Sequence, residues 1–310
     1  MNVLVLDKLA AGYKKALNER FPELVVHAAA KEEDVGEFIG RADILLCARI
    51  SDALMQKAVN LKWIQAVTTG TDYLTRLPSL KKDVLITTTR GIHGPQMSEM
   101  AFLLMLALNR NLPQVVKNQE KAHWENWPSK LIWKKKVGIF GVGVIGEELA
   151  RKCKAFAMEV FGVDVVKRQL ECIDRWYGPE DIIEVARQVD FLILVAPNTP
   201  QTEKIVGAKV LSSMKPTAYL INIGRGELVD EPALIDALNT GTIAGAALDV
   251  YWQEPLPKEH PLWRAKNLIA MPHMGGPSDV YVEQAMAVME ENFRRYLKGE
   301  RKNLINVVER

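Results

Sequence analysis

One stretch of the chain constrains the fold more than any other. Residues 137–146 are an apolar run that breaks into three glycines, Gly141, Gly143 and Gly146, spaced as G-x-G-x-x-G and followed by a helical pattern. A strand, a glycine turn and a helix in this order form a dinucleotide-binding loop. Gly141 permits the tight turn, Gly143 lets the backbone approach a pyrophosphate, and Gly146 lets helix and strand pack closely. The helix N-terminus adds free N–H donors, so the stretch predicts a dinucleotide site.

The next apolar run indicates which dinucleotide binds. Residues 159–164 form a short strand pattern ending in Asp164. A carboxylate at this position accepts hydrogen bonds from the adenosine ribose hydroxyls and repels a 2′-phosphate, which favours NAD over NADP. Lys167 and Arg168 could reach a 2′-phosphate if their loop folded back, so NADP stays open beside NAD.

Composition narrows the class of protein. A chain of 310 residues, 48% of them hydrophobic, can fill two cores. The formal charge of +2 predicts no attraction to nucleic acid or to a membrane surface. Three scattered cysteines are too few for a disulfide framework or a zinc cluster, so we expect no metal site and a cytoplasmic location. The N-terminal residues lack the features of a signal peptide, and the longest apolar stretch, residues 100–108, is far below the ~20 residues needed to cross a bilayer.

The order of apolar runs and helical patterns indicates two α/β domains. Short apolar runs alternate with helical segments over residues 1–98, and the alternation restarts at the glycine loop. Apolar runs of this kind between helices are typical of parallel strands covered on both faces. A predicted helix over residues 96–108 is apolar nearly all round, so we expect it between domains or in an oligomer interface. A helix over residues 279–298 should return the chain to the first domain.

Four chemically active side chains follow strands of the second block: Arg225, Asp249, Glu254 and His273. In a parallel sheet these strand ends share one edge, facing the crevice where the glycine loop would hold a dinucleotide. An arginine fork can grip the carboxylate and carbonyl oxygens of a 2-keto acid, and a histidine can supply a proton near neutral pH. A glutamate beside that histidine would fix its tautomer and favour the protonated ring. Each residue singly could be a turn or surface residue, but their agreement predicts hydride transfer.

The motifs around these residues resemble one known family. Residues 222–230 are similar to the N-x-x-R-G-x-x-V-D signature of the D-isomer-specific 2-hydroxyacid dehydrogenases. Residues 248–255 resemble that family's L-D-V-F-x-x-E-P, residues 271–273 its T-P-H, and residues 197–202 its P-x-T-x-x-T. With the glycine loop, the resemblance spans residues 137–276, and it is looser over the first 98 residues.

The resemblance implies an NAD-dependent oxidoreductase that interconverts a small 2-keto acid and the corresponding D-2-hydroxy acid. It assigns catalysis to Arg225, Glu254 and His273, with His273 giving the proton and Arg225 polarising the carbonyl. Asp249 would lie near the nicotinamide carboxamide. A homodimer built through the joining helices is also implied.

The same resemblance implies a Rossmann-like NAD-binding domain of residues 99–278, inserted into a flavodoxin-like substrate domain of residues 1–98 and 279–310. The predicted cofactor contacts are Gly141, Gly143, Val144, Ile145, Gly146, Asp164, Pro197, Thr202, Ile223 and Asp249. The predicted substrate contacts are Arg49, Thr69, Gly70 and Thr71.

Two other functions and several substrates stay open at this point. NAD-sensing corepressors of the C-terminal-binding-protein type share this fold and catalytic trio, but they usually extend beyond the dehydrogenase core. A formate dehydrogenase characteristically replaces the glutamate that stands here as Glu254. Tyr73, Leu74 and residues 274–277 depart from the family's common pattern, so the substrate could be glyoxylate, hydroxypyruvate, phenylpyruvate or a branched keto acid.

Overall fold

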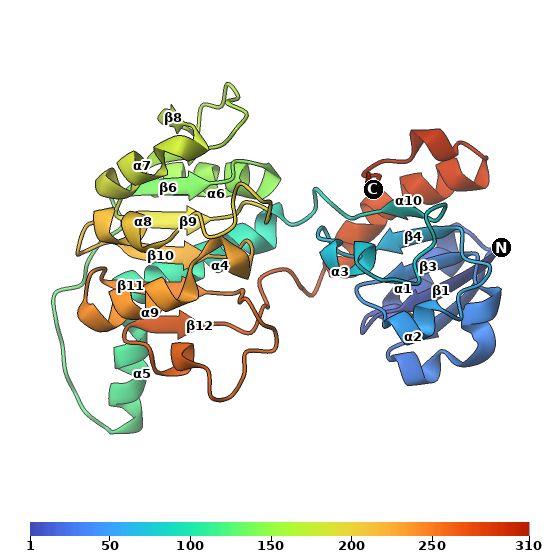
Figure 1. Cartoon of the computed structure of the whole chain (residues 1–310), viewed down its shortest axis with the longest axis horizontal. Helices are drawn as coiled ribbons and strands as arrows, with labels where there is room; N and C mark the ends of the chain where they lie inside the picture. The colour runs from blue at the N-terminus through green and yellow to red at the C-terminus, as the bar shows by residue number, and fades with distance from the viewer. Residues whose placement is uncertain (310) are drawn as a thin grey trace. The chain divides into compact units, whose positions relative to one another are not determined.

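The computed structural model describes residues 1–309 and divides the chain into two compact units (Figure 1). Unit 1 consists of Met1–Ile92 together with the chain from Ser278 onward, and unit 2 consists of His93–Pro277. Each unit is built on an entirely parallel sheet, which confirms the predicted α/β fold class with two Rossmann-like domains.

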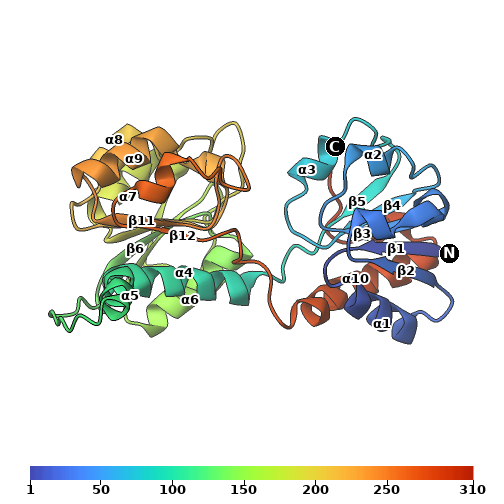
Figure 2. The same ribbon diagram turned by 90° about the horizontal axis from the view of Figure 1, so that it is seen from below.

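Unit 1 has a five-stranded sheet with helices on both faces. Its strands are β1 (Asn2–Leu6), β2 (Val25–Ala29), β3 (Ile44–Cys47), β4 (Trp63–Ala66) and β5 (Leu85–Thr87). Their order, β2-β1-β3-β4-β5, is the flavodoxin-like order. One face packs on α1 (Ala10–Arg20) and α10 (Tyr281–Leu297), and the other on α2 (Asp52–Met55) and α3 (Asp72–Thr75) (Figure 2).

The chain after β2 forms two short 3-10 segments rather than one of the helical segments predicted for residues 1–98. They are η1 (Glu32–Asp34) and η2 (Gly36–Arg41). Gly36 has φ +56°, a conformation that interrupts a helix between the two. A last 3-10 segment, η6 (Arg301–Asn303), follows α10.

Unit 2 has a seven-stranded sheet. Its strands are β6 (Lys136–Phe140), β7 (Glu159–Val163), β8 (Arg175–Tyr177), β9 (Phe191–Leu194), β10 (Tyr219–Asn222), β11 (Gly245–Leu248) and β12 (Leu268–Ala270). The order β12-β11-β10-β9-β6-β7-β8 is the dinucleotide-binding order 3-2-1-4-5-6, counted from β6, with one strand added at the β12 edge. The strand order changes direction between the parallel neighbours β6 and β9. In open α/β sheets, ligands bind outside the carboxyl ends of such a pair.

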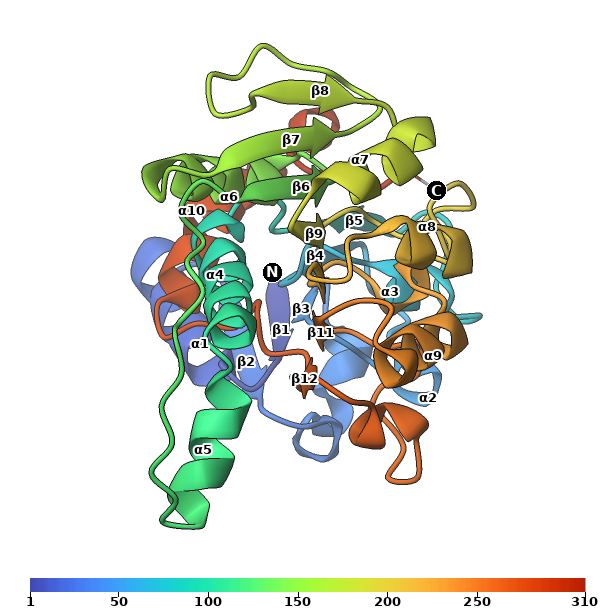
Figure 3. The same cartoon turned by 90° about the vertical axis from the view of Figure 1, so that its left-hand side faces the viewer.

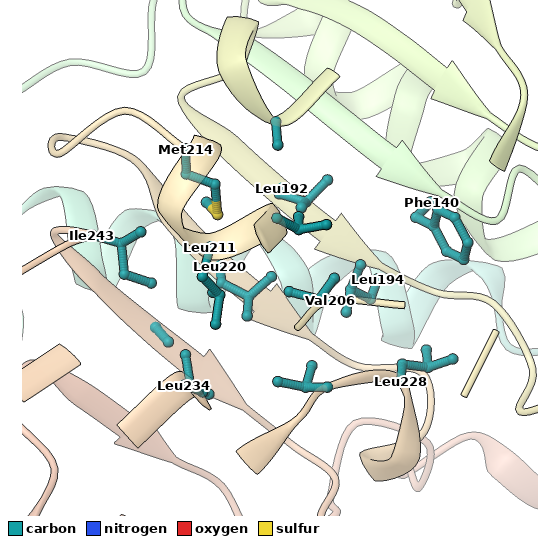
Figure 4. Close-up of a cluster of buried hydrophobic side chains, with 14 of the residues drawn as sticks. Phe140, Leu192, Leu194, Val206, Leu211, Met214, Leu220, Leu228, Leu234 and Ile243 are labelled. Carbon is teal, nitrogen blue, oxygen red and sulfur yellow. The ribbon is translucent and has the colours of Figure 1, made fainter. Parts of the chain in front are cut away.

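Apolar side chains on both faces of this sheet explain its helical layers. Phe191 and Ile193 of β9 point to the cluster shared with α4 (Gly94–Asn109) and α6 (Val144–Ala155). Leu192 and Leu194 point the opposite way, as strand geometry requires. Figure 4 shows this second cluster, where they meet side chains of α8 (Ala208–Ser213) and α9 (Glu231–Thr240). The remaining elements are α5 (Leu112–Glu120), α7 (Ile182–Gln188), η3 (Pro179–Asp181), η4 (Gly226–Leu228) and η5 (Pro261–Arg264).

Two helices of unit 2 differ from the sequence-based expectation because of proline. Helix α4 starts at Gly94, two residues earlier than predicted, because Pro95 lies in its first turn, where the missing N–H has no helical partner to lose. Pro113 likewise lies in the first turn of α5, which the sequence did not predict. Within unit 2, α4 packs on α6 and on the sheet, and this packing accounts for much of its apolar surface.

Candidate active site

The three glycines of the loop after β6 meet three different steric demands. Gly141 has φ +99°, and a Cβ there would lie 2.6 Å from the backbone nitrogen of Ala196. A Cβ on Gly146 would lie 2.2 Å from the carbonyl oxygen of Gly141. A Cβ on Gly143 would meet no atom within 4 Å. The space left open at Gly143, at the start of α6, fits the close approach of a pyrophosphate.

The charge of the first turn of α6 is compensated. Glu147 is the acidic residue of this turn, and a carboxylate there would compete with a bound anion. Its side chain pairs with Arg151 one turn later and, at 2.9 Å, with Arg168 from the loop after β7. The helix N-terminus therefore retains its attraction for a phosphate.

Asp164 and Arg168 both bond the backbone of Val142 in the glycine loop. Asp164 Oδ2 accepts the N–H of Val142 at 2.7 Å, and Oδ1 accepts the N–H of Val166 at 3.0 Å. Arg168 Nη2 donates to the carbonyl oxygen of Val142 at 2.6 Å. Arg168 thus folds back onto the glycine loop, the position from which it could reach a 2′-phosphate of NADP. Asp164 stands at the end of β7, the position from which its carboxylate would repel that phosphate.

Arg225 follows β10 in a turn organised by Asn222. The buried Asn222 side chain donates to the carbonyl oxygen of Arg225 at 2.7 Å and accepts the N–H of Gly224 at 3.1 Å. The guanidinium of Arg225 donates to the carbonyl oxygen of Gly224 at 2.8 Å. These contacts set the direction in which the Arg225 side chain leaves the sheet edge.

Glu254 and His273 form a hydrogen-bonded pair. Glu254 Oε2 lies 2.6 Å from His273 Nδ1, and Glu254 Oε1 accepts the N–H of Tyr251 at 3.2 Å. A carboxylate on Nδ1 selects the tautomer with its hydrogen on that nitrogen. The His273 side chain is 44% exposed, so its other nitrogen, Nε2, can meet a substrate.

Asp249 fixes the backbone around His273. His273 has φ +50°, a left-handed conformation that is strained for a residue with a Cβ. Asp249 Oδ1 accepts the N–H of Met274 at 2.8 Å, and Oδ2 accepts the N–H of Gly275 at 2.9 Å. Burial raises the pKa of Asp249, and these two amides partly oppose that rise. Asp249 therefore supports the turn that presents His273.

His93 is a further residue at this edge, and it was not among the residues predicted for the site. It precedes α4 and is buried, and its imidazole pKa is lowered to about 4, first by burial and then by the charge of Arg225. A neutral imidazole therefore lies near Arg225 at physiological pH. Pro95 was the signal that could have placed His93 at a helix start.

The other predicted cofactor contacts differ in how far their side chains are exposed. The hydroxyl of Thr202 donates to the carbonyl oxygen of Pro197 at 2.8 Å and closes the turn after β9. Val144 is exposed at the first turn of α6, and Ile145 is partly buried against the core. The Ile223 side chain lies in the core, so only its backbone is available to a ligand.

The predicted substrate residues lie in unit 1, at the carboxyl edge of its own sheet. Arg49 follows β3, and its guanidinium lies 5.7 Å from the ring centre of Tyr73. The turn after β4 carries residues 69–71, and the hydroxyl of Thr68 donates to the carbonyl oxygen of Gly70 at 2.9 Å. Within unit 1 the structure therefore gathers these residues at one edge of the sheet.

Residues 1–309 contain neither a grouped set of metal-ligating side chains nor a membrane-spanning helix. No three or more His, Cys, Asp and Glu side chains there are grouped as a metal site would require. In the same part of the chain, no helix combines the length and the apolar character of a membrane span.

Comparison with known proteins agrees with this geometry. Residues 102–275, more than half of the chain, match the family model described as "D-isomer specific 2-hydroxyacid dehydrogenase, NAD binding domain". This chain belongs to that family. It is 32% identical, over 99% of its length, to a D-3-phosphoglycerate dehydrogenase of Methanocaldococcus jannaschii, and spans 60% of that relative. It is 31% identical to a glyoxylate reductase of Thermofilum pendens, over 90% of this chain and 86% of the relative.

Solved structures of similar proteins have the same fold. A D-isomer specific 2-hydroxyacid dehydrogenase family protein from Aeromonas salmonicida superimposes with a TM-score of 0.91 at 32% identity, over 99% of this chain and 98% of the other. An acyclic imino acid reductase in complex with NADPH and D-Arg superimposes with a TM-score of 0.83 at 29% identity, over the full length of both chains.

Proposed function

We propose that this chain is an NAD-dependent D-2-hydroxyacid dehydrogenase that reduces a small 2-keto acid. The observation that carries the proposal is the Glu254–His273 pair on the same sheet edge as Arg225 and the glycine loop. Membership of the family supports an oxidoreductase of hydroxy acids in general.

The proposed roles follow from the contacts of the three side chains. When bound, the nicotinamide supplies a hydride to the carbonyl carbon of the substrate. His273 Nε2 gives a proton to the carbonyl oxygen as it gains charge, and Glu254 stabilises the ring through Nδ1. The Arg225 guanidinium polarises the same carbonyl and holds the developing charge. In the oxidative direction His273 accepts the proton instead.

We assign the substrate carboxylate to Arg49 and to the backbone amides around Gly70 and Thr71 in unit 1. A turn of successive amides and a guanidinium are both suited to a carboxylate. The glyoxylate reductase among the relatives favours a short 2-keto acid. The imino acid reductase with the same fold makes the imine of a 2-keto acid a second substrate to include in tests.

We propose NAD as the preferred cofactor because Asp164 stands at the end of β7. Its carboxylate would repel a 2′-phosphate placed there. The NADPH complex of the imino acid reductase and the position of Arg168 on the glycine loop make NADPH the competing cofactor. Asp164→Ser is therefore expected to raise the ratio of kcat/KM for NADPH to that for NADH about tenfold, since it removes one unfavourable charge.

One experiment tests the reaction and the cofactor together. Purified protein is assayed with NADH and with NADPH against a panel of 2-keto acids, each with and without ammonium. Turnover with NADH and a D-2-hydroxy acid product is the expected result. Bound NADH without turnover on any member of the panel would favour a cofactor-sensing scaffold, and a strong preference for NADPH would reject the assignment of Asp164.

We also propose a homodimer formed through unit 2. Helix α5 points away from the body of unit 2 (Figure 3) and exposes three apolar side chains, Leu112, Val115 and Val116. In the segment after α5, Trp124 is 93% exposed and Trp133 is also exposed. Exposed apolar surface on this scale is typical of a protein interface. Light scattering should give twice the monomer mass, and Val116→Glu should shift the protein toward monomer.

A further inference from the structure

Glu231 is a buried carboxylate that the reaction above does not use. It is the first residue of α9 and is 4% exposed. Its Oε1 accepts the N–H of Trp252 at 2.9 Å, and its Oε2 lies 3.4 Å from Nε2 of His260. Trp252 and His260 stand at the two ends of the segment that contains Glu254. One carboxylate thus joins both ends of that segment.

The orientation of the His260 ring determines which of its nitrogens faces Glu231. Its Nδ1 accepts the N–H of Leu262 at 3.3 Å, so the neutral ring carries its hydrogen on Nε2, the nitrogen that faces Glu231. Glu231 Oε1 therefore accepts a hydrogen bond, and Oε2 lies within ion-pair distance of the ring nitrogen that carries the hydrogen. A buried carboxylate is tolerated when it is paired in this way.

The same segment lies against the backbone next to Arg225. A Cβ on Gly226 would lie 2.1 Å from the carbonyl carbon of Tyr251, so only glycine fits there. The indole Nε1 of Trp252 donates to the carbonyl oxygen of Val229 at 2.8 Å. The turn after β10 and the segment carrying Glu254 consequently pack against each other. Glu231 adds a contact at each end of that segment.

We propose that Glu231 is a positioning residue, whose carboxylate closes residues 252–260 and thereby holds Glu254 against His273. This inference rests on the proposed function, because only a catalytic His273 makes the position of Glu254 matter for turnover. Displacing a catalytic group by about 1 Å can cost about 100-fold in rate. Loss of Glu231 should therefore lower kcat and leave substrate and cofactor binding nearly unchanged.

Three variants test the two contacts of the carboxylate. Glu231→Ala removes both, and we expect kcat to fall about 30-fold, with KM for the 2-keto acid and Kd for NADH within about threefold of wild type. Glu231→Gln keeps the acceptor for Trp252 but turns an amide NH2 toward the Nε2–H of His260. It should recover much of the lost kcat and match His260→Ala, which loses the same single contact.

Asp230→Ala is the matched control. The Asp230 side chain caps α9 through the N–H of Ala233. This variant weakens the same helix end but keeps both contacts of Glu231. Its kcat should therefore stay within about twofold of wild type. The proposal fails if Glu231→Ala keeps the wild-type kcat, raises only KM, or loses no more than Asp230→Ala.

Amide hydrogen exchange separates this inference from the proposed function. Glu231→Ala should speed exchange at residues 252–254, whereas Asp230→Ala should not. This measurement needs no turnover. If the wild-type protein reduces nothing in the panel, the proposed function fails, while faster exchange in Glu231→Ala still supports closure of the segment and unchanged exchange overturns it. Should Glu231→Ala fail to fold, Glu231→Gln and His260→Ala are measured in the same way.

Discussion

The two sheets of this chain carry their predicted functional side chains at carboxyl edges that are built differently. In unit 2, Asn222 and Asp249 are buried and bond the backbone beside Arg225 and His273. In unit 1, Arg49 lies over the ring of Tyr73, and residues 69–71 form a partly exposed turn before the four-residue helix α3. Catalytic groups need closely held geometry, whereas a region that selects substrates can vary. We therefore expect changes in unit 2 to affect kcat and changes in unit 1 to affect KM and substrate preference.

The largest expected effect is at the proton donor. His273→Ala should lower kcat in the reductive direction about 1,000-fold, because general acid catalysis typically contributes factors of this order. The Kd for NADH, measured by fluorescence, should stay near the wild-type value. His123→Ala changes an exposed histidine after α5 and is the control. Wild-type turnover in His273→Ala would contradict the expectation that the sheet edge of unit 2 controls kcat.

The glycine loop offers a pair of variants that separates binding from folding. Gly146→Ala places a Cβ 2.2 Å from the Gly141 carbonyl oxygen and should lower the free energy of unfolding by about 2 kcal/mol. Gly143→Ala meets open space, so stability should change by less than about 0.5 kcal/mol. Its Kd for NADH should still rise about tenfold, because the methyl occupies the approach of the pyrophosphate. Equal NADH affinity in Gly143→Ala and wild type would contradict this loop's assignment.

A pH-dependent prediction concerns His93 beside Arg225. Its folded-state pKa of about 4 lies below the ordinary value of 6.5, so only the unfolded chain takes up this proton as pH falls between those values. The stabilising contribution is fully present above pH 6.5 and decreases toward pH 4, with about 2 kcal/mol lost by pH 5. His93→Gln has no imidazole at this position, so it lacks this loss of stability. Urea denaturation at pH 7.5 and 5 should show wild type losing about 2 kcal/mol more than His93→Gln, and parallel losses would contradict the assignment.

The smallest expected effect is in unit 1. Arg49→Ala should raise KM for the 2-keto acid about tenfold, the value of one charge-assisted contact, with kcat within about threefold. Arg41→Ala changes an exposed arginine at the opposite end of the same strand and should leave both constants unchanged. A fall in kcat without a change in KM would show that Arg49 acts on the reaction itself, and the contrast between the edges would weaken.

Much of the fold could be predicted from sequence because apolar periodicity is local. The runs at residues 137–140 and 191–194 became β6 and β9 because each buries both of its faces. Elements without such a pattern were harder to predict. The three-residue strand β8 depends on pairing with β7, and α5 depends on the left-handed turn at Asn111. These depend on neighbours or backbone angles that no local run of residues specifies.

The sequence by itself determined the class of chemistry. A glycine loop fixes where a pyrophosphate can lie, and Arg225, Glu254 and His273 follow strands that must end at one edge of a parallel sheet. Tertiary structure alone decided how these side chains are held. Only folding brings the Asp249 carboxylate to the amides after His273, lays Arg168 on the glycine loop, and joins Glu231 to both Trp252 and His260. Such contacts link residues that are distant in the chain, and their partners are chosen by packing, which sequence spacing does not encode.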